Sequence, residues 1–453
     1  MLSFRDRYSI VPSRLDSTYQ LPLIRWSNAK FSLLQNSNWY YSYFAHQNKN
    51  LLRHKKNQLV SRIRPSRLTS FMLSIIVLCC TYVSHAQDTS RLRVSILTCG
   101  VGEDLYSCYG HSAIRIIDSS TGTDIVYNYG TFNFGDPDFY SKFTRGKLPY
   151  YLNDENFQGF IGTYINEGRG VTEQLLDLTD KDAKMVQYFL SDNLKEENKY
   201  YRYDFLLDNC STRVRDIFPT LFNTRFEFGH SMADDSCSFR TILDQYEKNK
   251  HWERVGINLL MSHLVDNKMS NVQSMFLPDY LMKGISDATL DGKPIVKETI
   301  SILPQIIAIP TEVNQPKMLL WAFLFAVVFL SFNKTFQPWL VYVDVLLFML
   351  LGLLGCFMLF MWFGTEHAVC SYNRNLFWAF PLHLIFAFML TRNSDKASRY
   401  ARYASWLVTL SMLYGLIATQ AYMSEIIPLL LLILFRLGKY ARRSTYFAFN
   451  KQV

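Results

Sequence analysis

Two kinds of motif are missing from this 453-residue sequence. It contains no glycine-rich loop of the GxxxxGK[ST] type, which would cradle the phosphates of a nucleotide. The histidines and cysteines of its middle region also lack the spacing of a metal site; they are His230, Cys237, His251 and His263. We therefore expect neither a cofactor nor a bound metal.

Acidic residues are scarce at the N-terminus. Residues 1–70 hold 12 Lys+Arg and two acids, a local charge of +10, whereas the whole chain carries +9, so the remainder sums to about −1. The basic excess belongs to this prefix, and no nucleic-acid partner is expected for the folded part. A mis-assigned start, with translation beginning at Met72 or nearby, explains the prefix; a cytoplasmic arm or an unusual targeting segment is the alternative.

An export signal follows the prefix at residues 71–86. Arg62, Arg64 and Arg67 precede the apolar run 71–83, and Ser84-His85-Ala86 supplies the small residues of a cleavage site. The run is shorter than the roughly 20 residues that span a bilayer, so we expect cleavage after Ala86. Residues 87–310 then form an exported domain.

From residue 316 to about 440 the sequence predicts an all-α membrane domain of about five helices. The apolar segments are roughly 317–333, 339–363, 375–391, 404–422 and 424–438. Basic residues concentrate in 391–403 and in the C-terminal tail, including Arg436, which predicts a cytoplasmic C-terminus, residues 441–453, in a bacterial inner membrane. Asp344 lies within a predicted span. It either has a functional role there or lies close enough to the end of the span to be exposed at the membrane interface. Glu366, His367 and Cys370 of the external loop would suit a metal ion, although a polar connector is the commoner role.

The exported domain has the pattern of an α+β fold. Strands are predicted at Arg93–Cys99, Tyr109–Ile117 and Asp124–Tyr129, the last two forming a hairpin across the turn residues 118–123. Further strands are predicted at Thr172–Leu178 and Tyr200–Leu207, with a helix at 179–194. Another helix begins at Asp208-Asn209-Cys210, where Val214, Ile217, Phe218 and Leu221 share one face.

The pair that carries chemistry is His111 at the head of a strand and Cys210 at the head of a helix. A helix N-terminus favours the thiolate form of a cysteine and offers backbone N–H groups to an oxyanion. A nearby imidazole can take the thiol proton and later protonate a leaving group. The alternatives are structural roles. Cys210 would be a small buried residue or form a disulfide with Cys99, Cys108 or Cys237, and His111 would be a polar residue at a strand end with its hydrogen bonds made.

The hairpin suggests a third member of the group. If its turn centres near residues 120–121, Ala113 pairs with Asn128 and His111 with Gly130, so that His111 and Asn128 share a face as diagonal neighbours. A slip of one residue would bring Tyr127 or Tyr129 there instead. Asn128 is therefore the predicted group that orients the imidazole.

The runs ILTCGVGEDLYSCYGHSAIRIID, VYNYGTFNF, KYYRYDFLLDNCSTRVRD and FLPDYLM resemble the bacterial Lnb-type N-terminal periplasmic domain family. The resemblance covers roughly residues 90–300 and implies a signal peptide, one periplasmic domain and several C-terminal spans. The order of His111 before Asn209-Cys210 is also similar to circularly permuted papain-like enzymes, the NlpC-type amidases and lecithin–retinol acyltransferase-like proteins. That second resemblance implies His111 as base and Cys210 as nucleophile. No second histidine follows on the next strand, so Asn128 must serve.

These observations together predict a membrane-tethered periplasmic cysteine hydrolase or acyltransferase. Its expected substrates are amide or ester bonds of the cell envelope, in peptidoglycan peptides or acylated lipids, and membrane lipid is an expected partner. The alternative is a non-catalytic accessory, maturation or partner-binding domain anchored in the inner membrane. A transporter or sensor is disfavoured because Asp344 is the only acid in the interior of a span, Glu425 standing at the very start of the last one. The sequence leaves the oligomeric state open.

Overall fold

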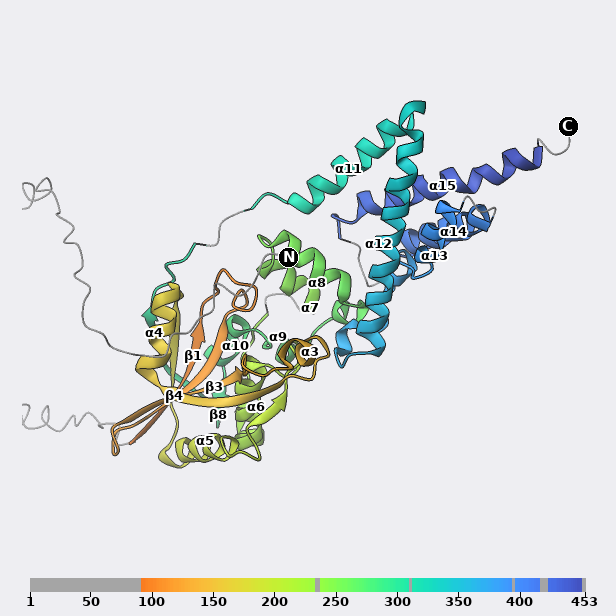
Figure 1. Cartoon of the computed structure of the whole chain (residues 1–453). Coiled ribbons are helices and arrows are strands. Elements are labelled where there is room, and N and C mark those ends of the chain that lie inside the picture. The colour runs from red at the N-terminus through yellow and green to blue at the C-terminus, as the bar shows by residue number, and fades with distance from the viewer. Residues whose placement is uncertain (1–90, 233–236, 309–311, 393–395, 416–422, 450–453) are drawn as a thin grey trace, which may run out of the picture. The chain divides into compact units, whose positions relative to one another are not determined.

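A computed structural model describes residues 91–232, 237–308, 312–392, 396–415 and 423–449. The predicted signal peptide and the basic prefix lie outside these residues. The N-terminal domain (residues 91–308) mixes strands and helices, and the C-terminal domain (residues 312–449) is helical, as the sequence predicted (Figure 1).

A seven-stranded antiparallel sheet forms the centre of the N-terminal domain, in the order β10-β5-β1-β2-β3-β4-β6. Its strands are β1 (Leu92–Cys99), β2 (His111–Asp118), β3 (Thr123–Thr131), β4 (Pro149–Asn156), β5 (Val171–Leu176), β6 (Tyr200–Arg202) and β10 (Val296–Leu303). A second sheet contains β7 (Phe226–Glu227), β8 (Thr289–Leu290) and β9 (Lys293–Pro294). β2 and β3 are antiparallel neighbours joined by a short turn, as the predicted hairpin requires.

The predicted hairpin register is confirmed. Ile114 pairs with Tyr127 and Ile116 with Ile125, and continuing this register pairs Ala113 with Asn128. The strand predicted at 200–207 is wrong beyond Arg202. There the Asp204 carboxylate accepts hydrogen bonds from the amides of Leu206 and Leu207 (2.9 and 3.0 Å), which turns the chain instead of extending it.

Helices cover both faces of the large sheet (Figure 1). One face packs Ile96, Ile114 and Ile116 against buried residues of α5 (Asp180–Asn193), α6 (Cys210–Phe222) and α10 (Pro278–Ser286). The other face packs Leu97, Cys99, Ala113 and Val126 against α4 (Phe157–Glu167). Because alternate residues of a strand point to opposite faces, β1 and β2 are apolar on both.

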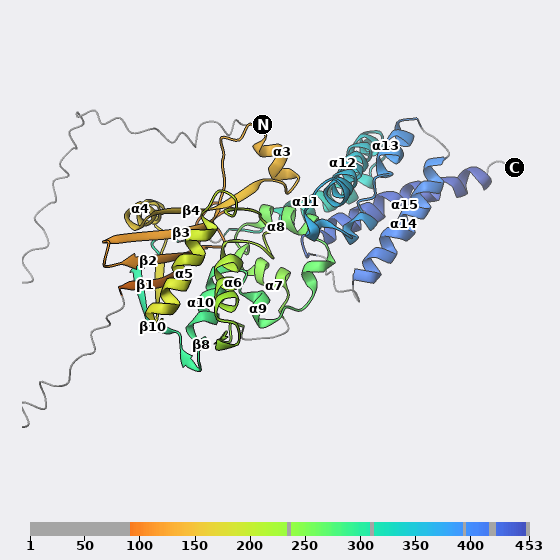
Figure 2. The same cartoon turned by 90° about the horizontal axis from the view of Figure 1, so that it is seen from below.

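Shorter helices complete the N-terminal domain (Figure 2). They are α3 (Phe139–Thr144), α7 (Phe239–Tyr246), α8 (His251–Leu260), α9 (Asn271–Ser274) and the 3-10 turns η2 (Asn223–Arg225) and η3 (His263–Asp266). α7 contributes Phe239, Ile242 and Leu243 to a separate apolar cluster that includes Cys108 and Tyr109. The segment that leads into His111, at the start of β2, is therefore anchored by the packing of Cys108 and Tyr109.

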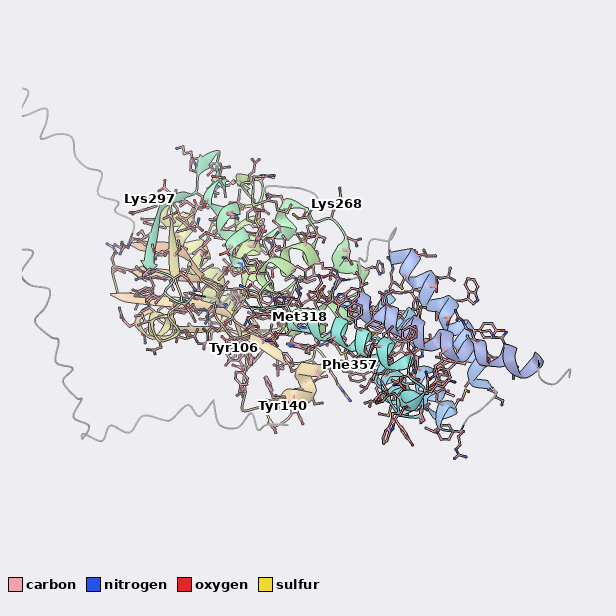
Figure 3. The ribbon with its side chains drawn as sticks, turned by 90° about the horizontal axis from the view of Figure 1, so that it is seen from above. Tyr106, Tyr140, Lys268, Lys297, Met318 and Phe357 are labelled. Carbon is pink, nitrogen blue, oxygen red and sulfur yellow. The ribbon has the colours of Figure 1, made fainter. Side chains whose placement is uncertain are left out.

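The C-terminal domain contains α11 (Gln315–Ser331), α12 (Gln337–Phe363), α13 (His383–Thr391), α14 (Lys396–Gly415) and α15 (Ile427–Phe449), with 3-10 turns η4 (Lys334–Phe336), η5 (Ala368–Cys370) and η6 (Arg374–Phe377). Among the described residues, Lys334–Phe363 is long and apolar enough to cross a membrane, and α11 is a shorter apolar helix. Met318 and Phe357, both labelled in Figure 3, are exposed on these helices, as side chains facing lipid would be.

Three predicted segments of this domain need correction. Residues 375–391 are not one helix, because Pro381 interrupts the run and α13 begins after it, at His383. The basic stretch predicted as a loop at 391–403 is largely helical, since α14 begins at Lys396. The last helix, predicted at 424–438, runs over Ile427–Phe449 and so includes residues 441–449 of the predicted tail.

Arg436 is also not a charge of the tail. It is buried and pairs with the fully buried Asp344 of α12, with Nε and Nη2 at 2.5 and 2.7 Å from the two carboxylate oxygens. The Tyr440 hydroxyl donates to the same carboxylate, and Arg436 donates to the hydroxyl of Ser331. Asp344 is therefore neither exposed nor unpaired: its pair with Arg436 links α12 to α15, and the bond of Arg436 to Ser331 extends the link to α11.

The loop after α12 contacts the N-terminal domain. Glu366 forms ion pairs with Arg202 and Lys147, and its amide donates to the carbonyl of Arg145. The ring of His367 contacts the carbonyl of Thr144 at 3.2 Å. Near the start of α15, Glu425 pairs with Arg254 of α8. Both connections therefore lie against the same domain.

Candidate active site

The β2–β3 hairpin brings His111 and Asn128 into contact. The Nε2 atom of His111 lies 2.5 Å from the Oδ1 atom of Asn128. An amide oxygen can only accept a hydrogen bond, so Nε2 carries a proton and Nδ1 remains as the acceptor of the neutral ring. Asn128 thus orients the imidazole and selects its tautomer, which is the relation that the sequence register predicted.

Cys210 is the first residue of α6. Asn209 caps the helix: its Oδ1 accepts from the amide of Thr212 (2.9 Å), and the Thr212 hydroxyl accepts from the amide of Asn209 (2.7 Å). The buried Asn209 side chain also donates to the carbonyls of Phe205 and Phe276. The capping box therefore fixes where Cys210 stands at the positive end of the helix dipole.

Two features of the sheet let α6 approach His111. The buried hydroxyls of Ser112 and Ser211 are 3.0 Å apart and join β2 to the first turn of α6. Gly130 has a left-handed φ of +93°, at a point where β3 departs from its register with β4. A Cβ on Gly130 would lie 3.7 Å from the Cβ of Cys210, which is ordinary van der Waals contact, so the backbone of β3 passes directly beside the cysteine.

The electrostatics of the pair favour ionisation of the thiol. Burial opposes the charge on Cys210, but the positive charge of His111 and its hydrogen bond, the amide of Ser112 and the hydroxyl of Ser211 outweigh it and lower the pKa of Cys210 to about 7. Burial likewise disfavours charge on His111, but the Cys210 thiolate and the hydrogen bonds with Cys210 and Asn128 raise the pKa of His111 above its ordinary value. The pair is therefore suited to a thiolate–imidazolium state near neutral pH.

The other cysteines of this domain have different surroundings. Cys99, Cys108, Cys210 and Cys237 are all free thiols, so the structure contains none of the disulfides considered for Cys210. Burial raises the pKa of Cys99 and of Cys108 to about 12, which keeps both protonated. Cys210 is partly exposed, and its lowered pKa makes it the cysteine best suited to nucleophilic attack.

Sequence reasoning missed Ser112 and Ser211. Both follow a predicted site residue directly, one after His111 and one after Cys210. Ser112 supplies an amide and a hydroxyl, and Ser211 lies with its hydroxyl 4.0 Å from the Cys210 sulfur. No periodicity marks such residues, because their contact joins positions that are 99 residues apart.

The loop after α12, whose residue types would suit a metal ion, has other contacts. His367 contacts Thr144, Glu366 pairs with Arg202, and Cys370 is buried. No group of three or more His, Cys, Asp or Glu side chains suited to a metal ion occurs in the part of the chain that the structure describes. A cavity of about 710 Å³ lies nearby, lined by Trp362, Phe377, Leu410 and Tyr414 among others, and none of the three predicted site residues lines it.

Comparison with known proteins supplies the family. The model of the Lnb N-terminal periplasmic domain matches residues 80–245, and that of the Lnb transmembrane domain matches residues 309–445. No curated protein and no solved structure matches the chain. The two matches contain the site residues, the helices α11 to α14 and most of α15, in the order that the sequence predicted. The chain belongs to the Lnb family of membrane proteins with an N-terminal periplasmic domain.

Proposed function

We propose that this protein is a membrane-tethered periplasmic cysteine hydrolase or acyltransferase that acts on amide or ester bonds of the cell envelope. The observation that carries the proposal is the Cys210 thiol at the start of α6, whose pKa is lowered to about 7 by a His111 ring that Asn128 orients. A histidine on β2, an asparagine on β3 and a cysteine on the later α6 also have the chain order of a permuted papain-like enzyme.

The proposed reaction has two acyl-transfer steps. The Cys210 sulfur attacks the carbonyl carbon, a C–S bond forms, and the carbonyl electron pair moves to oxygen. When the tetrahedral intermediate collapses, the bond to the leaving alcohol or amine breaks, and imidazolium His111 gives that group its proton. Water or a second acceptor then attacks the thioester, transfers a proton to His111, and releases the Cys210 thiolate.

The membrane topology that fits this role has the C-terminus in the cytoplasm. The connections that contain Glu366 and Glu425 contact the periplasmic domain, so both would lie outside. Five crossings would then leave the C-terminus inside, together with the basic first turns of α14. Reporter fusions after residue 370 should read as periplasmic and fusions after residue 449 as cytoplasmic. A periplasmic reading at the C-terminus would overturn this topology.

The activity is tested on the purified full-length protein in detergent, with 4-nitrophenyl butyrate as acyl donor and iodoacetamide as alkylating agent. We expect a burst of nitrophenolate equal to the enzyme concentration and a thioester on Cys210, detected by mass spectrometry. Cys210→Ser and His111→Ala should lose the burst, whereas the matched variant Cys237→Ser should keep it. A wild-type protein that forms no thioester with any acyl donor would favour the non-catalytic partner-binding alternative.

A further inference from the structure

One polar group beside Cys210 has no use in the scheme above. The hydroxyl of Tyr201, on β6, is buried, and it has no hydrogen-bond partner among the described residues. Buried hydroxyls nearly always have a partner, so an unpartnered one needs an explanation. A group that binds only during the reaction is one such explanation.

The Tyr201 hydroxyl lies in the same small space as Cys210. A Cβ on Gly130 would be 4.0 Å from the Tyr201 oxygen and 3.7 Å from the Cβ of Cys210. The absent side chain of Gly130 thus leaves room between the hydroxyl and the nucleophile. Burial is the main reason that the pKa of Tyr201 is raised well above its ordinary value, and a Cys210 thiolate raises it further. The hydroxyl therefore stays protonated and is a donor, not a base.

The Tyr201 ring is held in place by charge as well as by packing. The guanidinium of Arg213 lies over the ring at 4.1 Å from its centroid, and a bidentate ion pair with Asp208 fixes that guanidinium at 2.5 and 2.6 Å. Tyr129 packs edge-on against the same ring, at 6.2 Å between centroids. Asp208 stands two residues before Cys210, so the segment that positions the nucleophile also fixes Tyr201.

We infer that Tyr201 is a catalytic residue whose hydroxyl donates a hydrogen bond to the oxyanion of the tetrahedral intermediate. This inference rests on the proposed acyl transfer. As the C–S bond forms, the carbonyl electron pair moves to oxygen, and Tyr201 stabilises that charge without giving up its proton. The hydroxyl has no hydrogen bond to the described residues, so it need not break one of these when the oxyanion appears. A donor that is already in place before the reaction is the preorganisation that oxyanion-binding sites use.

The test separates acylation from alkylation. Attack on iodoacetamide displaces iodide and forms no oxyanion, whereas attack on 4-nitrophenyl butyrate does. In the full-length protein, Tyr201→Phe should slow the acylation burst about 100- to 1,000-fold, the usual loss for one oxyanion donor. Its alkylation rate and the midpoint of that rate near pH 7 should equal those of the wild type. Tyr200→Phe, an exposed tyrosine on the same strand, is the matched control and should change neither rate.

Each other outcome has a definite meaning. Acylation of Tyr201→Phe within about threefold of wild type would overturn the role of Tyr201 and leave the proposed function intact, since one donor is worth far more. An equal loss of acylation and alkylation would also overturn it, because Tyr201 would then act on the thiol itself. A wild type without acylation would remove the proposed function instead. If Tyr201→Phe fails to fold, 3,5-difluorotyrosine at this position keeps the ring, and an unchanged acylation rate would exclude the role.

Discussion

The two domains each contain a cluster of charged and polar groups, and the clusters differ in how many of those groups have hydrogen-bond partners. In the membrane domain, both oxygens of Asp344 accept hydrogen bonds, and Arg436 uses its remaining nitrogen on Ser331. In the periplasmic domain, Cys210 and His111 are partly exposed, and the Tyr201 hydroxyl has no partner within the described ranges.

This difference distinguishes a cluster with a structural role from a cluster suited to catalysis. A buried charge that is fully paired stabilises one arrangement of the helices that bear it, and it has no capacity left for a ligand. A polar cluster with open positions costs stability but can bind charge that develops during a reaction. The Asp344 cluster is therefore a structural link between helices, whereas the Cys210 cluster has the open positions of a site.

The largest effect is expected from removing the base. His111→Ala should slow acylation of Cys210 by roughly 100- to 10,000-fold, the range for general acid–base catalysis. It should also raise the midpoint of alkylation from about pH 7 toward or above the ordinary thiol value, because the imidazolium that favours the thiolate is gone while burial remains. Rates of iodoacetamide labelling across the neutral and alkaline range measure this. His263→Ala is the control, and an unshifted midpoint in His111→Ala would contradict the assigned pair.

In the membrane domain, we expect substitutions that lower the stability of the protein and leave the reactivity of Cys210 unchanged. Asp344→Ala leaves Arg436 buried without its carboxylate and should lower the free energy of unfolding by about 3–5 kcal/mol. The double variant Asp344→Leu with Arg436→Leu should recover much of that loss, because it buries no charge. Thermal unfolding of the full chain in detergent measures both. A double variant as unstable as the single one would show that the pair does more than neutralise charge.

A buried carboxyl outside both clusters, that of Glu247, sharpens the comparison. Glu247 accepts from the Tyr109 hydroxyl, but its second oxygen has no partner among the described residues, and burial raises the pKa of this carboxyl to about 7. A carboxyl whose pKa is higher in the folded state than in the unfolded state stabilises the fold while it is protonated, and that contribution is lost as pH rises through about 7.

Glu247→Gln should therefore abolish a pH dependence of stability. A tenfold change in proton affinity on folding corresponds to about 1.4 kcal/mol, so the wild type should lose roughly 3 kcal/mol between about pH 4.5 and pH 8, relative to the variant. Melting temperatures of both proteins across this range provide the measurement. Parallel curves for the two proteins would mean that Glu247 is ionised throughout.

The smallest effect is expected from the residue that orients the base. Asn128→Ala removes one hydrogen bond to the His111 ring, and a hydrogen bond to a charged group is worth about 1.5–3 kcal/mol. Acylation should therefore slow about 10- to 100-fold, with the Cys210 thiol still alkylated. Asn128→Asp should be the better tolerated change, since a carboxylate also accepts from Nε2. A rate for Asn128→Ala equal to that of His111→Ala would mean that the ring loses its position altogether.

The sequence by itself determined the features that arise from local pattern. Alternation and turn chemistry predicted the β2–β3 register and hence the contact of His111 with Asn128. Capping residues and the helical spacing of apolar residues predicted that Cys210 begins a helix. Long apolar segments predicted a helical C-terminal domain, because an apolar run can be recognised without knowing what it packs against.

Only the tertiary structure decided how distant segments meet. It placed α6 against β2 through the contact of Ser112 with Ser211. It also placed Cys210 and the buried Tyr201 hydroxyl beside the backbone of Gly130. It also moved Arg436 from the predicted tail to a pair with Asp344, 92 residues away. Such contacts depend on the packing of whole elements, and the sequence of any one segment contains no periodicity that reports them.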